Sequence, residues 1–128
     1  MYFADLSPYT FLGHPPDEKI LNVGWLDNEH SFPTGQLDST VLDHLFGLCL
    51  KPVRKTRGFH QCLLCPRLEL GYLVQHGGKE RRLGSAEIRL KARNDVVFAS
   101  PDMIFHYVRD HNYMPPAVFV KALEEMTT

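Results

Sequence analysis

The sequence has few cysteines, no long apolar segment and no excess of charge of either sign. Its 128 residues include three cysteines, and an odd, small number argues against a disulfide framework and for a reducing compartment. The formal net charge of −1 gives no overall field that would attract nucleic acid or an anionic membrane. No apolar segment approaches the roughly 20 residues of a membrane span, and the first residues lack a basic segment followed by an apolar one. We therefore expect a cytoplasmic protein without a membrane partner.

The length and composition predict a single domain at residues 1–128. Apolar residues make up 44% of the sequence and charged residues 23%, which is typical of soluble globular proteins. A chain of this size buries roughly two-thirds of the surface that its unfolded form exposes, so it needs no covalent cross-link to fold. Residues 1–19 are rich in proline and aromatic side chains, and we expect them to wrap the domain as an arm without forming an element.

Apolar periodicity predicts the elements that follow the arm. They are a strand at 20–26, a helix at 36–50, two hairpins at 71–83 and 87–99, a helix from Ser100-Pro101-Asp102 to about 111, and a helix that starts at Pro115-Pro116. This order predicts an α+β fold, in which a small antiparallel sheet packs with about three helices.

All three cysteines lie between residues 49 and 65, and two of them belong to an H-x-C-x-x-C cluster. His60, Cys62 and Cys65 form this cluster, and a C-x-x-C turn brings two thiolates close enough to share one metal ion. In extended backbone His60 and Cys62 point the same way, which favours joint ligation. With Cys49 as the fourth ligand the set is Cys3His, which predicts a saturated, structural zinc site.

Cys49 has a second interpretation that the sequence leaves open. It falls on the apolar face of the predicted helix at 36–50, where a cysteine often acts as a small buried hydrophobic residue. We favour ligation because the helix ends within a residue or two, and its last turn can direct the side chain toward the following loop. Without Cys49, the site would be completed by His76, His106 or His111, or by water.

Four segments carry a resemblance to a known family. They are Asn22-Val23-Gly24-Trp25-Leu26; Thr56-Arg57-Gly58-Phe59-His60 with Cys62 and Cys65; Leu83-Gly84-Ser85-Ala86-Glu87-Ile88; and His106-Tyr107-Val108 with His111, Tyr113, Pro115 and Pro116. Together they resemble a family of small bacterial proteins known as a domain of unknown function, over most of the chain. The resemblance implies a free-standing bacterial cytoplasmic protein and assigns no activity.

Two catalytic uses of the C-x-x-C turn are disfavoured by its surroundings. A redox dithiol usually opens a helix after a strand, and here Pro66 follows the second cysteine instead of lying between the two. A zinc deaminase needs H-x-E followed downstream by P-C-x-x-C, and the sequence contains neither pattern.

Nucleic-acid binding is a further interpretation, and we do not favour it. It would use two short basic segments, which contain Lys51, Arg54, Lys55 and Arg57 beside Phe59 in the first and Lys79, Arg81 and Arg82 in the second. Such runs of charge are more often solvated faces, especially in a chain with almost no net charge.

The leading functional hypothesis is a small zinc-binding domain that binds an unidentified protein partner without catalysis. The alternative is a small metal-dependent hydrolase, in which Glu87 would take a proton from zinc-bound water. We expect Glu87 to pair with a neighbouring arginine instead. His106 and His111 are five residues apart on one predicted helix, too far round it to form a metal pair by themselves.

Overall fold

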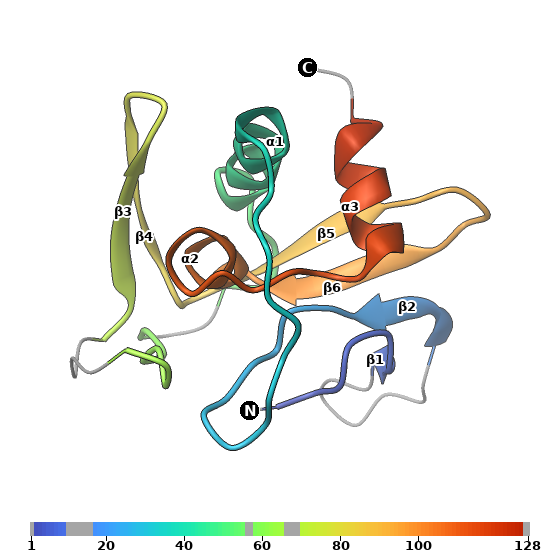
Figure 1. Cartoon of the computed structure of the whole chain (residues 1–128), viewed down its shortest axis with the longest axis horizontal. Helices are drawn as coiled ribbons and strands as arrows, with labels where there is room; N and C mark the ends of the chain where they lie inside the picture. The colour runs from blue at the N-terminus through green and yellow to red at the C-terminus, as the bar shows by residue number, and fades with distance from the viewer. Residues whose placement is uncertain (1, 10–16, 56–57, 66–69, 127–128) are drawn as a thin grey trace.

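The computed structural model describes residues 2–9, 17–55, 58–65 and 70–126, and within them it has an α+β fold (Figure 1). In chain order the elements are β1 (Pro8–Tyr9), β2 (Asp17–Asn22), α1 (Ser39–Cys49), β3 (Tyr72–His76), β4 (Lys79–Leu83), β5 (Glu87–Lys91), β6 (Val97–Pro101), α2 (Ile104–Asp110) and α3 (Ala117–Glu124). The predicted fold class is confirmed, since three helices accompany two small, mostly antiparallel sheets among these residues.

The larger sheet has four strands in the order β1-β2-β6-β5. The β5–β6 hairpin is antiparallel as predicted, but β2 joins β6 in parallel, with Ile20 opposite Val97. The N-terminal arm also contributes β1 to this sheet, so the expectation that it forms no element was wrong. β2 ends at Asn22, earlier than predicted, because Gly24 has a φ of +84° that regular strands do not allow.

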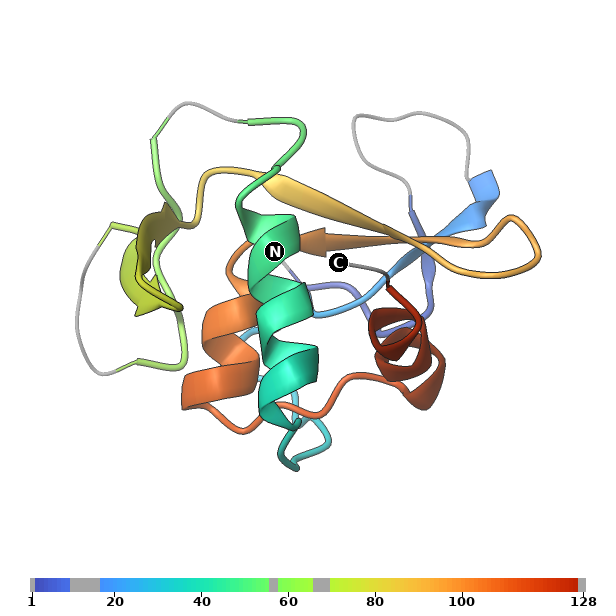
Figure 2. The same ribbon diagram turned by 90° about the horizontal axis from the view of Figure 1, so that it is seen from above.

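The second sheet is the β3–β4 hairpin, which the sequence predicted. Its two-residue turn is Gly77-Gly78, and both glycines have positive φ, as a tight hairpin turn requires. The hairpin stands at one side of the molecule (Figures 1 and 2). It packs inward through Val74 and His76. The centroid of the His76 ring lies 5.2 Å from that of Phe46 in α1 and 5.1 Å from that of Phe105 in α2.

The helices pack on one another and on the larger sheet. α1 contacts α2, α3 and β5, and α3 also contacts β5; Figure 2 shows α2 and α3 on the same side of the sheet. The apolar spacing of α1 buries Val41, Leu45 and Phe46, and Asp38 caps the helix by accepting a hydrogen bond from the Val41 amide. None of the described helices is long and apolar enough to cross a membrane.

Candidate metal centre

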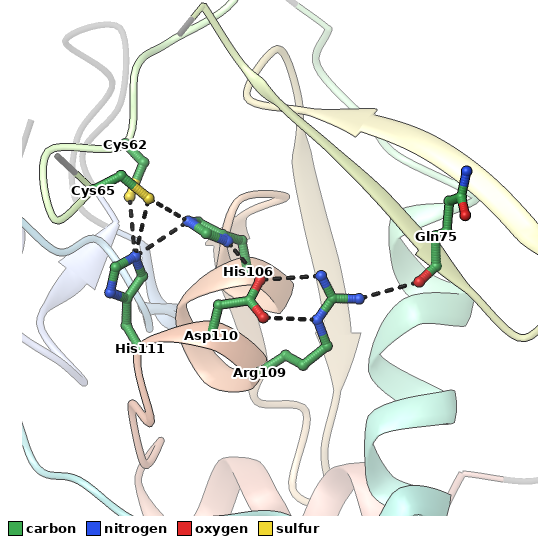
Figure 3. A network of polar contacts seen from close by, with 7 residues as sticks. All are labelled: Cys62, Cys65, Gln75, His106, Arg109, Asp110 and His111. Carbon is green, nitrogen blue, oxygen red and sulfur yellow. Dashed lines mark hydrogen bonds and ion pairs between the residues drawn. The ribbon is translucent and has the colours of Figure 1, made fainter. Parts of the chain in front are cut away.

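Four side chains with metal-binding atoms converge between the loop after α1 and the end of α2. They belong to Cys62, Cys65, His106 and His111, and their ligand atoms all lie within 4.8 Å of one another (Figure 3). The Cys65 Sγ lies 3.1 Å from His106 Nε2 and 3.3 Å from His111 Nε2. The Cys62 Sγ lies 3.6 Å from His111 Nε2, and the two Nε2 atoms are 3.2 Å apart. This geometry is compatible with a metal site.

The helix α2 places His106 with its Nε2 toward the two sulfur atoms. The side chain is 1% exposed, and its ring stacks on Tyr72 of β3 with a centroid distance of 3.7 Å. One turn later, Asp110 Oδ2 lies 2.8 Å from His106 Nδ1. A proton on Nδ1 that is donated to this carboxylate leaves Nε2 with a free lone pair, which is the form that binds metal.

Asp110 is itself held by Arg109. The Arg109 Nε and Nη2 donate to the two oxygens of Asp110 at 3.0 Å each, and Nη1 donates to the Gln75 carbonyl at 3.2 Å (Figure 3). Burial opposes ionisation of Asp110, but the hydrogen bonds from Arg109 and His106 outweigh it, so the pKa of this carboxyl is lowered. Burial lowers the pKa of His106, although Asp110 partly offsets the effect. Asp110 therefore stays ionised and His106 stays neutral near pH 7.

His111 joins the group because the helix stops before it. α2 ends at Asp110, and His111 has φ −116° and ψ 9°, with its amide still bonded to the Tyr107 carbonyl. Asn112 then takes a left-handed conformation, with φ +57°. The expectation that His106 and His111 lie too far round the helix to face each other was wrong, because it assumed that helical rotation continues through residue 111.

The loop that carries both cysteines is anchored by backbone hydrogen bonds at His60. The His60 amide donates to the Gly84 carbonyl at 2.7 Å, and the Gly71 amide donates to the His60 carbonyl at 2.9 Å. These contacts place Cys62, which is 3% exposed, and the half-buried Cys65 over the end of α2. The His60 side chain is exposed and does not belong to the group of four.

Cys49 also lies outside the group of four. It is on the apolar face of α1, 1% exposed, with its Sγ 3.5 Å from the Asp102 carbonyl. Burial raises the pKa of the Cys49 thiol, and the negative charge of Asp102 adds to the effect, so the thiolate needed for ligation is disfavoured. Of the predicted ligands, the structure thus brings together Cys62 and Cys65, and it supplies His106 and His111 in place of Cys49 and His60.

Glu87 is engaged elsewhere, in the pairing expected from the sequence. Its Oε1 lies 2.8 Å from Arg89 Nη2 and accepts a hydrogen bond from the Tyr9 hydroxyl at 3.0 Å. The carboxylate belongs to the β5 end of the larger sheet and is not one of the four converging residues.

A family model described as Domain of unknown function (DUF7919) matches residues 1–124. The chain belongs to this family. Membership confirms the resemblance to an uncharacterised domain family, and it assigns the DUF7919 chain no activity. No curated protein and no solved structure matches the chain.

Proposed function

We propose that the protein is a small zinc-stabilised binding domain, in which Cys62, Cys65, His106 and His111 hold one Zn²⁺ ion. The observation that carries the proposal is the spacing of the ligand atoms. Zinc bonds of about 2.3 Å to sulfur and 2.0–2.1 Å to nitrogen give tetrahedral edges of roughly 3.5 Å for sulfur–nitrogen pairs and 3.3 Å for nitrogen–nitrogen pairs. In the structure, three of the four sulfur–nitrogen separations are 3.1, 3.3 and 3.6 Å and the nitrogen–nitrogen separation is 3.2 Å, while all four ligand atoms lie within 4.8 Å of one another.

Four protein ligands favour a structural role for the ion. A Cys2His2 set fills the tetrahedron and leaves no position for water, as in structural zinc sites. The ion would join the loop at 58–65 to the C-terminal end of α2, and binding would be coupled to folding. The carboxylate of Asp110 behind His106 is the partner that metal-bound histidines commonly have.

The hydrolase alternative has less support. It requires an open coordination position and a base beside the metal. The proposed four ligands would close the site, and the candidate base Glu87 is paired with Arg89.

Exposed apolar side chains near the cysteine loop support a protein partner. Leu63, between the two cysteines, is exposed, as are Phe59 before them and Leu70 and Leu73 after them. A zinc ion would hold Leu63 in place, because Cys62 and Cys65 on either side of it would both be bound to the metal. The basic segments give nucleic acid less support, since Arg82 contacts the Leu70 carbonyl and the Phe59 ring. The bacterial origin and cytoplasmic location implied by the resemblance remain part of this proposal.

The test is the metal content of protein purified without added metal or chelator, together with a count of reactive thiols. We expect one zinc per chain and no readily reactive thiol in the zinc-bound protein, because Cys49 is buried in the core, whereas a chelator should make the thiols of Cys62 and Cys65 reactive. Cys62→Ser and His106→Ala should lose the metal, whereas the matched variants Cys49→Ala and His60→Ala should retain it. Metal-free wild-type protein, or loss of metal from Cys49→Ala, would refute the proposed ligand set.

A further inference from the structure

A cavity of about 570 Å³ lies beside the cysteine loop and is not used by the metal site. The segment after β2, the end of β6, the start of β5 and the loop residues next to Cys62 form its walls. Its volume falls within the range of roughly 300–1,000 Å³ that is usual for small-molecule sites. Six of its lining residues carry the argument: Trp25, Leu63, Glu87, Asp102, Met103 and Tyr107.

Most of the cavity wall is apolar, and Trp25 and Tyr107 contribute aromatic rings to it. The Trp25 indole is held by a hydrogen bond from Nε1 to the Ala99 carbonyl at 3.0 Å. Tyr107 of α2 is buried. Aromatic rings attract cations in addition to burying apolar groups.

Two of the polar side chains that line the cavity, Glu87 and Asp102, are buried carboxylates. Asp102 is 3% exposed, and its Oδ1 accepts a hydrogen bond from the Gly84 amide at 2.8 Å. Within the described part of the chain, no Lys, Arg or His forms an ion pair with Asp102, whereas Glu87 has Arg89. Burial raises the pKa of Asp102 to about 6, so near pH 7 the cavity wall contains a charged carboxylate with amide hydrogen bonds and no counter-ion.

We propose that this cavity binds a small organic cation, a primary amine that carries an apolar or aromatic group. The ammonium group would lie against Asp102, and the apolar group would contact Trp25, Met103 and Tyr107. Two basic residues, Arg54 and His60, also line the cavity, but both are exposed. Solvent screens their charges far more than those of the buried carboxylates.

Trp25 is the single tryptophan of the chain, so its fluorescence reports directly on the cavity. The metal-loaded protein is titrated with three probes that share a phenyl group: phenethylamine, 2-phenylethanol and 3-phenylpropanoate. We expect the amine to bind at least about tenfold more tightly than the alcohol, and the carboxylate more weakly than either. Equal or tighter binding of the alcohol or the carboxylate, or no response to any probe, would overturn the proposal.

Two kinds of variant locate the binding. Asp102→Asn keeps an oxygen for the Gly84 amide and should abolish the preference for the amine. Leu63→Lys adds a cation to the cavity wall without burying it and should weaken amine binding, whereas Leu73→Lys, on the exposed side of β3, should not. Equal amine binding by the two lysine variants would overturn the proposal even if Asp102→Asn fails to fold. Zinc content is measured on the same samples. Protein that retains zinc but shows no preference for the amine would refute the proposed amine ligand and leave the proposed zinc site standing.

Discussion

Replacing Asp110 by Asn should weaken zinc binding while leaving the metal-free fold nearly unchanged. The carboxylate lies 2.8 Å from His106 Nδ1 and is held at both oxygens by Arg109. Asn keeps the shape but loses the charge, and its amide group can donate to Nδ1 and so favour the tautomer with a proton on Nε2. Loss of such a supporting carboxylate typically costs 10- to 100-fold in metal affinity, which corresponds to about 1.4–2.8 kcal/mol.

The effect on the metal-free protein should be smaller because Asp110 and Arg109 are both partly exposed. Ion pairs of that kind contribute about 0–1 kcal/mol. The assay is competition for zinc against a chromophoric chelator, combined with thermal melting of the metal-free forms.

Asp43→Asn is the matched control for this prediction. Asp43 Oδ1 also contacts a histidine, His76 Nε2, at 2.6 Å, but that pair lies outside the group of four. Zinc affinity should be unchanged in this variant. An Asp110→Asn protein that competes for zinc as well as the wild type, or an equal loss in Asp43→Asn, would refute the assigned role of the carboxylate.

Three further predictions concern the core. Cys49→Ala should retain the cobalt-substituted tetrahedral spectrum and lose about 1 kcal/mol in urea unfolding; a lost thiolate-to-cobalt band would make Cys49 a ligand. Gly24→Ala should lower the free energy of unfolding by about 1–3 kcal/mol, because residue 24 has a φ of +84° and the added Cβ would lie 2.6 Å from Ile104 Cδ1. Gly47→Ala in α1 should raise it by about 0.4–1 kcal/mol in the same assay, because the space around the added Cβ is open. Burial raises the pKa of Asp102 from 3.8 to about 6, so the folded state holds this proton more tightly than the unfolded state. Between pH 4 and pH 7 the free energy of unfolding of the wild type should then fall by up to about 3 kcal/mol relative to that of Asp102→Asn. If urea unfolding gives the same pH dependence for the two proteins across that range, the predicted destabilisation is refuted.

The sequence predicted the elements whose signals are local. The apolar spacing of α1 and the Gly77-Gly78 turn depend on residues within a few positions of one another. The predicted helix start at Ser100-Pro101-Asp102 was wrong, because Ser100 and Pro101 belong to β6 and α2 begins only at Ile104, after an N-cap residue that makes no side-chain capping bond. The parallel pairing of β2 with β6 was not predicted, because those strands are far apart in the sequence and local periodicity does not specify which strands pair.

Only one side of the candidate metal site was predicted from the sequence. The C-x-x-C turn identified Cys62 and Cys65, because two ligands three residues apart form a local signal. The histidine side depended on where α2 stops, and an uncertainty of one residue decides whether His111 follows the helical rotation. Asn112, which takes the left-handed conformation just after the helix end, was the available signal for that stop.

The two halves of the proposed metal centre are separated by 41 residues, counted from Cys65 to His106. During synthesis, both cysteines emerge from the ribosome well before α2. A nascent chain that ends at β4 has both cysteines and neither histidine of the group of four, so it cannot form the closed tetrahedron. Stable zinc uptake should therefore be a late event in biogenesis, and until then the Cys62-Cys65 dithiol is open to oxidation and to competing metals.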